Sequence, residues 1–321
     1  MDALLLRLKG AKAPVSGTAL ADLWGVTRAA VHKRVQKLRA AGHRIEGTTR
    51  VGYHWAGSSA RLDSESLKRG LVTQVVHFPV LGSTQDEAKS RATRGAGEGT
   101  LVIADRQTAG RGRMGRSWVS PVGGLWFSLV LRPVVPPDRV PALTLVAALD
   151  WVDLFRSLGV PAGVKWPNDV WADGKKIAGI LTEMSAETDR IHWVAMGVGV
   201  NVHNRPPTDT PVPAASLSAW TKAVSPEGLL VDWLERFSKS YDRFCRSGFG
   251  PFRSAYEKRF LLKGGRVSFD GPEGRSVGRV LGVDERGRLR LSTAQGAVAC
   301  VGGEVSLLRP MSGASVKKGK R

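Results

Sequence analysis

The sequence predicts a multidomain α+β protein, and three observations support this. Apolar residues recur at helical spacing near the N-terminus, the middle of the chain mixes strand-like and helix-like segments, and short strand-like segments separated by glycines follow residue 262. A chain of 321 residues is long enough for two or three domains with cores of their own. We expect domains over 1–60, 67–262 and 263–310, and a flexible basic tail over 311–321.

The composition limits the kinds of partner and of environment. A formal net charge of +20 favours polyanionic partners such as DNA or nucleotides. The two cysteines, Cys245 and Cys300, lack metal-ligand neighbours, which argues against a disulfide framework or a zinc site and fits a reducing cytosol. The sequence has no signal-peptide pattern and no apolar run of transmembrane length. We therefore expect a cytoplasmic protein with no membrane partner.

The first two helices are predicted from apolar spacing and capping residues. Leu4, Leu5 and Leu8 form the apolar face of the first helix, which the segment from Gly10 to Pro14 ends. Ser16 is placed to cap a second helix, and Gly25 supplies the left-handed residue that stops it.

A third helix and two short strands complete the first domain. Thr27 is placed to cap this helix, and Gly42 ends it; its core face is predicted to be Val31, Val35, Leu38 and Ala41. The following RIEGTTRVGYHW predicts two strands about a turn at residues 50–52. This order of elements is that of a winged helix-turn-helix.

A winged helix-turn-helix presents the N-terminal residues of its recognition helix to base edges, and basic residues to phosphates. The predicted DNA contacts are Thr27, Arg28, Ala29 and Lys33, with Arg50 of the wing touching the DNA backbone. A protein-interaction module is the alternative, because winged helices also serve that role.

The run GRGRMGRSW, from Gly110 to Trp118, follows the apolar segment LVIAD and combines glycines with arginines. Glycine lets the backbone approach a ligand, while Arg111, Arg113 and Arg116 supply forked donors that match carboxylate and phosphate oxygens. Trp118 could cover a flat ring such as a nucleobase. The alternatives are a solvated basic turn or a nucleic-acid patch and, for Trp118, a core residue that anchors the end of the loop.

Two further segments carry polar residues next to strands. In VVHFPVLGSTQDEAK, Ser83 or Thr84 opens a helix after a strand, which brings hydroxyls and backbone N–H groups together in a polar corner; an ordinary helix cap is the alternative for Ser83. In KWPND the proline fixes the backbone, so that Asn168 and Asp169 leave a strand end at a set angle, although a capped turn would equally explain this pair.

The strand KIAGILTE begins with Lys176, whose ammonium could bridge a carboxylate and a phosphate. Side chains alternate between the two faces of a strand, so Lys175 should point to the opposite face and be solvated.

These segments together resemble the biotin protein ligases, specifically the bifunctional type that also acts as a biotin operon repressor. The resemblance spans most of the chain, and KWPND with KKIAGIL is its most specific part. The motifs that carry it, in family order, are GSTQDEA (82–88), DRQTAGRGRMGRSW (105–118), GGLWFSLVLRP (123–133), KWPND (165–169), KKIAGIL (175–181) and GVGVNV (197–202).

The resemblance implies roles for individual residues. Biotin would be bound by Ser83, Thr84, Gln107 of the next strand, Gly110, Arg111, Arg113 and Lys176. ATP or the adenylate would be bound by Arg113, Arg116, Trp118, Asn168, Lys176 and Asn201, with Asp169 supporting the site or its Mg²⁺. Lys176, Arg113 and Arg116 would carry catalysis by neutralising charge. Gln85 stands where many members have Asn, so it is not assigned to biotin.

The resemblance also implies a fold and an activity. The catalytic domain would have the mixed α/β architecture of class II aminoacyl-tRNA synthetases and biotin/lipoate ligases, followed by an SH3-like β-barrel. Biotin and MgATP would form biotinyl-5'-AMP, and biotin would pass to a lysine of the biotin carboxyl carrier domain of a carboxylase. The adenylate would also be the co-repressor that favours a homodimer on operator DNA.

Two other functions stay open. One is a lipoate or octanoate transferase of the same fold, although such an enzyme would not be expected to keep the whole GRGRMGR loop together with Lys176. The other is a biotin-sensing DNA-binding repressor without ligation activity, which should have lost a charge from the phosphate site.

Overall fold

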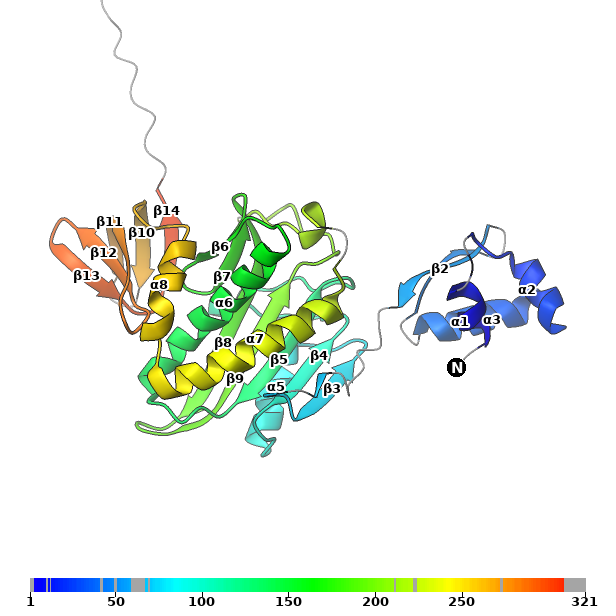
Figure 1. Ribbon diagram of the computed structural model, residues 1–321, viewed down its shortest axis with the longest axis horizontal. Coiled ribbons are helices and arrows are strands. Elements are labelled where there is room, and N and C mark those ends of the chain that lie inside the picture. The colour runs from blue at the N-terminus through cyan, green and yellow to red at the C-terminus, as the bar shows by residue number, and fades with distance from the viewer. Residues whose placement is uncertain are drawn as a thin grey trace, which may run out of the picture.

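The chain forms three groups of elements in sequence order (Figure 1). This computed structural model describes residues 3–9, 11, 13–40, 43–48, 51–58, 67–68, 70–210, 212–221, 224–271 and 274–308. None of the helices in these ranges is both long enough and apolar enough to span a bilayer.

The N-terminal group has the elements of a winged helix-turn-helix. They are α1 (Ala3–Lys9), α2 (Gly17–Trp24), α3 (Arg28–Ala40), β1 (His43–Thr48) and β2 (Gly52–Ser58), with β1 and β2 antiparallel. The predicted caps are confirmed. Ser16 Oγ accepts from the Ala19 N–H at 3.0 Å, Gly25 has φ 60°, and Thr27 Oγ1 accepts from the Ala30 N–H at 3.1 Å. Local capping chemistry therefore sets the ends of these helices.

This domain has a hydrophobic core of its own. The core comprises Leu4, Leu8, Leu20, Ala21, Val31, Val35, Leu38, Ile45 and Tyr53. Arg39 holds β1 against α3 by donating to the carbonyls of Ile45 and Gly47, each at 2.8 Å. The predicted core face of α3 is thus confirmed for its three largest members. The side chain of Leu5, and residues Ala41, Gly42 and Arg50, lie outside the described part of the chain.

The small and polar residues from Gly57 to Ser66 are typical of a linker, but the structure corrects the start of this segment. Gly57 and Ser58 belong to β2, because the hairpin register extends to a pairing of His43 with Ser58. Residues 59–66 lie outside the described ranges.

The central group is built on a seven-stranded mixed sheet of order β3-β4-β5-β9-β8-β7-β6, in which β3 and β4 are parallel and the other neighbours antiparallel. Its elements are β3 (Gln74–Phe78), α5 (Thr84–Thr93), β4 (Thr100–Ala104), η1 (Arg113–Gly115), β5 (Leu125–Leu131), η2 (Pro137–Arg139), α6 (Val140–Ser157), β6 (Ala162–Lys165), β7 (Asp169–Ala172), β8 (Lys175–Ala186), β9 (Ile191–Val200), η3 (Leu217–Ala219), α7 (Pro226–Ser247) and α8 (Gly250–Arg259). This confirms the predicted mixed α/β domain.

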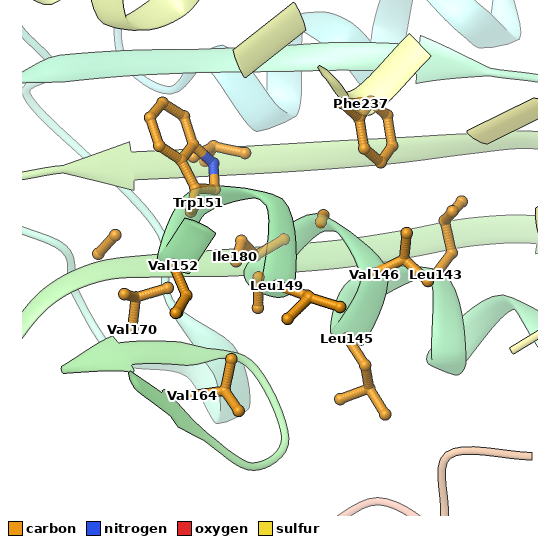
Figure 2. Close-up of a cluster of buried hydrophobic side chains, with 14 of the residues drawn as sticks. Leu143, Leu145, Val146, Leu149, Trp151, Val152, Val164, Val170, Ile180 and Phe237 are labelled. Carbon is orange, nitrogen blue, oxygen red and sulfur yellow. The ribbon is translucent and has the colours of Figure 1, made fainter. Parts of the chain in front are cut away.

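Helices cover both faces of this sheet. Ala88 and Ala92 of α5 pack with Val102, Val130 and Ala195, which alternate along their strands with residues of the larger core. Helix α6 packs on the opposite face, where its leucines and valines meet side chains of the strands and of α7 (Figure 2). Strands buried on both faces read as continuous apolar runs, which explains the composition of β4 and β5.

Aromatic rings join α6 to α7. The rings of Trp151 and Trp233 stack at a centroid distance of 5.2 Å, and those of Trp233 and Phe237 at 4.6 Å. Their planes are within 8° of parallel, and all three side chains are fully buried. This stack fixes α7 against α6 and supports the sheet from behind.

The C-terminal group is one antiparallel sheet. Its strands are β10 (Arg266–Gly271), β11 (Gly274–Val283), β12 (Leu289–Thr293), β13 (Gly296–Cys300) and β14 (Glu304–Leu307), in the order β13-β12-β11-β10-β14. The predicted short strands are therefore present, while closure into an SH3-like barrel stays a prediction, as do the domain boundaries. The predicted tail at 311–321 lies outside the described residues.

The C-terminal sheet shares its core with the central domain. Val267 and Leu291 belong to the same buried cluster as α6. Trp166 Nε1 of the central domain donates to the carbonyl of Gly287 at 3.0 Å. A sheet held in this way is placed to contribute residues to a site on the central domain.

One partly buried carboxyl between α6 and α7 predicts a dependence of stability on pH. Burial raises the pKa of Asp150 to about 7, although a hydrogen bond from Ser240 Oγ at 3.0 Å acts in the opposite direction. A raised pKa means that the folded state holds the proton more tightly, so the free energy of unfolding falls as pH rises from about 4 to about 7.

We expect Asp150→Asn to remove most of this slope, because the amide cannot ionise. At pH 8 the free energy of unfolding should rise by about 1–2 kcal/mol. This is less than the full shift in the pKa of Asp150 implies, because the side chain is partly exposed. Thermal unfolding at pH 5 and pH 8 measures it. The matched control is Asp153→Asn on the same helix, which breaks an ion pair with Arg259 at 3.0 Å and should not stabilise. Parallel pH profiles for Asp150→Asn and the unchanged protein would contradict the prediction.

Candidate active site

A cavity of about 590 Å³ lies where α5, the 110–118 loop, the KWPND turn and strands β8 and β9 converge with β14. It gathers most of the residues predicted for biotin and ATP. Among its lining residues are Ser83, Thr84, Gln107, Arg111, Arg113, Arg116, Trp118, Asn168, Asp169, Lys176 and Asn201. Of the predicted ligand residues, Gly110 alone is not in the lining; it supports the loop, since its carbonyl accepts from the Trp118 N–H at 2.8 Å.

The N-terminus of α5 forms a polar corner at one end of this cavity. Ser83 caps the helix by accepting from the Asp86 N–H at 3.4 Å. The N–H and the hydroxyl of Thr84 both donate to Gln107 Oε1, at 2.7 and 3.0 Å. Gln107 Nε2 donates in turn to Ser120 Oγ at 2.8 Å. The side chains predicted for the biotin ring are therefore held in fixed orientations.

The position of Gln107 differs from the prediction that it lies in a strand. Strand β4 ends at Ala104, and Gln107 lies beyond it, where isolated bridges pair it with Leu81 and Ser120. These bridges set Gln107 beside the start of α5 instead of in the sheet.

The glycine and arginine loop lies across the cavity and is held by arginine contacts. Arg111 donates to Asp86 at 2.7 Å, and Arg113 donates to Asn168 Oδ1 at 3.1 Å and to the Gly303 carbonyl at 3.2 Å. Arg116 forms two hydrogen bonds with Glu304, at 2.7 and 2.5 Å. The contacts with Gly303 and Glu304 join the loop to the C-terminal group of strands.

The KWPND segment is the turn between β6 and β7, and it has a cis peptide bond before Pro167. Asn168 is fixed to β8, because its Nδ2 donates to the Ile180 carbonyl and its own carbonyl accepts from the Ile180 N–H, both at 2.9 Å. The Asn168 amide oxygen is thereby left facing Arg113.

Lys176 and Asp169 form an ion pair inside the cavity. Lys176 Nζ lies 2.7 Å from Asp169 Oδ1, and both side chains are mostly buried. The ammonium is also 5.0 Å from the ring centre of Trp118, within the range of a cation–π contact. Lys175 is exposed, which confirms the prediction that it points away from the site.

Trp118 lies on two glycines of the sheet. A Cβ atom at Gly199 would stand 2.6 Å from Trp118 Nε1, and one at Gly179 would stand 3.0 Å from its ring. The indole meets Trp126 edge-on at 6.4 Å, and its Nε1 is buried without a hydrogen-bond partner among the described residues. Trp118 thus anchors the end of the loop and also borders the cavity, while its stacking on a nucleobase stays a prediction.

This packing predicts that Gly199→Ala weakens the binding of ATP. The added methyl cannot coexist with the present position of Trp118, so the ring and the loop attached to it must move, and we expect ATP affinity to fall about tenfold or more. Titration with ATP or a non-hydrolysable analogue measures it. Gly97→Ala is the control, because a Cβ there would meet no atom within 4 Å. Equal ATP affinities in the two variants would contradict the role given to the packing of Trp118 on Gly199.

Asn201 follows β9 and is 4% exposed. Its Oδ1 accepts from Asn204 Nδ2 at 2.8 Å, and its backbone N–H donates to the Ile177 carbonyl at 2.9 Å. It lines the cavity, held by these contacts just after β9, the strand that pairs with the Lys176 strand β8.

Three of the lining residues that sequence reasoning did not assign are polar or charged side chains with marked environments, namely Lys165, Glu304 and Ser128. Burial lowers the pKa of the Lys165 ammonium, which lies 4.1 Å from the ring of Trp171. The hydrogen bond from Arg116 lowers the pKa of Glu304. Ser128 is fully buried below the polar corner. Lys165 could have been assigned from the KWPND motif, because it is the first residue of that motif. No local signal in the sequence marks Glu304 or Ser128.

The charge of the cavity indicates what it can do. Five cationic side chains line it, namely Arg111, Arg113, Arg116, Lys165 and Lys176, while its described lining contains neither histidine nor cysteine. Burial lowers the pKa of Arg113, but Asp169 and Glu304 act in the opposite direction. Such a site suits anionic substrates that react with each other while protein cations neutralise their charge.

The predicted DNA contacts lie on the N-terminal domain. Thr27, Arg28, Ala29 and Lys33 are exposed at the start of α3, and the hydroxyl of Thr27 also caps the helix. This placement agrees with a recognition helix, and contact with bases stays a prediction.

Fold and site together define a ligase-type catalytic domain that carries an N-terminal helix-turn-helix. The model of the biotin/lipoate A/B protein ligase family matches residues 78–201, and that of a helix-turn-helix domain matches residues 1–54. The bifunctional ligase/repressor BirA of Bacillus subtilis is 38% identical over 304 residues, which is 91% of this chain and 94% of that protein. The Escherichia coli protein of the same name is 28% identical over 91% of this chain and 92% of its own length.

Solved structures support the same assignment. A biotin protein ligase from Aquifex aeolicus, in complex with biotin and ATP, is 32% identical and superposes with a TM-score of 0.64, covering 74% of this chain and 100% of that one. The chain therefore belongs to the biotin protein ligase family, in its bifunctional ligase and repressor branch.

Proposed function

We propose that this chain is an ATP-dependent biotin protein ligase. The observation that carries the proposal is the arrangement of one cavity, with the polar corner of Ser83, Thr84 and Gln107 at one end and the cations Arg113 and Lys176 at the other. A neutral ring with polar edges suits the first end, and carboxylate and phosphate groups suit the second. The binding of biotin and ATP by the Aquifex ligase supports this assignment of substrates.

In the first step a carboxylate oxygen of biotin attacks the α-phosphorus of ATP. A new P–O bond forms, the bond to the bridging oxygen of pyrophosphate breaks, and biotinyl-5'-AMP results. Both reactants are anions, so Lys176 lowers the barrier by standing between them, with Arg113 and Arg116 on the phosphate. Arg116 must exchange its contact with Glu304 for the phosphate to do so.

Most of the oxygen ligands for Mg²⁺ at this site would come from the phosphates of ATP, and fewer from the protein. Mg²⁺ is commonly held by one or two carboxylates together with phosphate oxygens, and Asp169 is an oxygen donor in the cavity. Within the described ranges no three His, Cys, Asp or Glu side chains form a metal-binding group. Bound to ATP, the ion would neutralise phosphate charge, and Asp169 would be its protein contact.

In the second step a lysine amine of the acceptor attacks the carbonyl carbon of the anhydride, and AMP leaves as the amide forms. The 110–118 loop would cover the intermediate and exclude water, since water would hydrolyse it. We propose that the acceptor is the biotin carboxyl carrier domain of a carboxylase, such as that of acetyl-CoA carboxylase.

We further propose a second function in transcription. Thr27, Arg28, Ala29 and Lys33, with Arg50 of the wing, would contact operator DNA, and biotinyl-5'-AMP would be the co-repressor that favours a homodimer. By linkage, operator binding and adenylate binding would then strengthen each other. A cytoplasmic location follows from these roles.

The test of the ligase is pyrophosphate release and acceptor labelling with biotin and MgATP, beside octanoate and lipoate, on the full chain. Biotin-dependent turnover is the expected result. Turnover with octanoate or lipoate alone would establish the transferase instead. Biotin binding without turnover would establish a sensor and leave only the DNA-binding role.

A further inference from the structure

A chain of hydrogen bonds runs from the protein surface to the polar corner of the cavity. It begins at Lys89, whose Nζ lies 2.7 Å from Glu183 Oε1, and continues from Glu183 Oε2 to Gln85 Nε2 at 2.9 Å. Gln85 Oε1 is 3.1 Å from Ser128 Oγ, which is also 3.0 Å from Thr84 Oγ1. The function described above uses Thr84 but neither Gln85 nor Glu183.

Glu183 and the backbone carbonyl of Ala195 together determine the orientation of the Gln85 amide. Gln85 is 4% exposed, and its Nε2 faces two groups that only accept hydrogen bonds, the Glu183 carboxylate and the Ala195 carbonyl at 3.1 Å. Reversing the amide would place its oxygen against both acceptors. The amide oxygen is therefore held toward Ser128 and the cavity, where a Cβ atom at Gly197 would stand 2.5 Å from it.

The environment of the Glu183 carboxyl favours its ionised form. Burial acts to raise the pKa of its carboxyl, but hydrogen bonds from Lys89 and Gln85 outweigh this, and the pKa is lowered overall. The carboxylate is thus ionised at neutral pH, and an ionised carboxylate can only accept.

Ser128 connects Gln85 to the side chains that line the corner, because its single hydroxyl hydrogen is shared between two acceptors, Gln85 Oε1 and Thr84 Oγ1. The Thr84 hydroxyl proton is directed to Gln107 Oε1, so Thr84 Oγ1 offers a lone pair to Ser128. Gln107 uses one Nε2 hydrogen on Ser120, and its second has no partner among the described residues. A ureido ring carries one carbonyl acceptor and two N–H donors, so a corner with fixed donors and acceptors is what its recognition requires.

We propose that Glu183 is a positioning residue for the ureido end of biotin, acting through Gln85, Ser128 and Thr84 from outside the contact surface. This inference rests on the proposed biotin ligase function. It also explains how this chain uses glutamine at position 85, since the longer amide spans from Ser128 to Glu183.

The experiment compares the full-length protein with Glu183→Gln by steady-state pyrophosphate release, varying biotin and ATP separately. A glutamine at 183 offers an amide that accepts or donates, so the orientation of Gln85 then depends on the Ala195 carbonyl alone. We expect KM for biotin to rise about tenfold, the loss of about 1.4 kcal/mol typical of one buried hydrogen bond, with kcat and KM for ATP within about twofold. Desthiobiotin, which keeps the ureido ring, should show the same ratio.

Controls separate positioning from general damage. Glu187→Gln alters an exposed carboxylate beyond the end of β8 and should leave every constant unchanged. Lys89→Met keeps the contact between Glu183 and Gln85 and should raise KM for biotin less than threefold. Glu183→Asp keeps the charge but cannot reach Gln85, so it should reproduce the effect if Glu183→Gln does not fold.

Two results would overturn the inference while the ligase function stands. One is an unchanged KM for biotin in a folded Glu183 variant of an active enzyme. The other is a matching rise in KM for ATP or loss of kcat, which would indicate damage to the whole site. If the unsubstituted protein shows no biotin-dependent turnover, the proposed function itself fails, and the inference fails with it.

Discussion

Replacing Lys176 with alanine should reduce adenylate formation by about 10²–10³-fold or more, the loss seen when a preorganised electrostatic group is removed from a transition state. Lys176 Nζ lies in the cavity 2.7 Å from Asp169 and faces the ring of Trp118, where the carboxylate and the α-phosphate would meet. Its removal leaves two approaching anions without their shared cation and Asp169 without its partner.

Biotin-dependent pyrophosphate release measures this effect. Lys175→Ala is the matched control, because the neighbouring lysine is exposed on the other face of β8 and should have no role. The N-terminal domain should stay folded in both variants, since its core contains no residue of the central sheet. Normal adenylate synthesis by Lys176→Ala would remove the central role given to this side chain.

Deleting residues 1–60 should abolish specific binding to operator DNA and spare ligation. The deletion removes all the predicted DNA contacts, and a specific complex is about 10³–10⁷-fold tighter than a non-specific one. The catalytic cavity should survive, because every residue that lines it lies between Ser83 and Val305.

Two assays on the same preparation test both parts of this prediction. A gel-shift titration with DNA from upstream of biotin genes measures operator binding, and a ligation assay measures activity. Arg28→Ala in the full chain is the companion variant, expected to weaken DNA binding while the domain stays folded. Loss of ligation in the truncated protein would mean that the domains depend on each other more than their separate cores indicate.

Features that depend on a few neighbouring residues were predictable from the sequence. The caps at Ser16, Thr27 and Ser83 are where capping rules place them, and the left-handed Gly25 ends α2. The alternation of Lys175 and Lys176 follows from strand geometry alone. The cavity residues were identified through the family resemblance, and the structure brings nearly all of them together.

Contacts between segments far apart in the chain were not predictable. Nothing around Gln107 indicates that it would leave the strand and pair with Leu81 and Ser120. Likewise, no local pattern assigns Glu304 to Arg116, or the backbone of Gly303 to Arg113. The importance of Gly179 and Gly199 comes from the indole that lies on them, which only the folded chain shows.

The contacts of Arg113 with Gly303 and of Arg116 with Glu304 have a consequence for the order of folding during synthesis. Arg116 is separated from Glu304 by 188 positions, so Glu304 leaves the ribosome after every strand of the central sheet. Domains fold in the order in which they emerge, so the central sheet forms while its loop lacks the contacts with Gly303 and Glu304. A nascent chain would therefore hold this loop from the central domain alone, and the contacts of the loop would be complete only after the C-terminal sheet has folded.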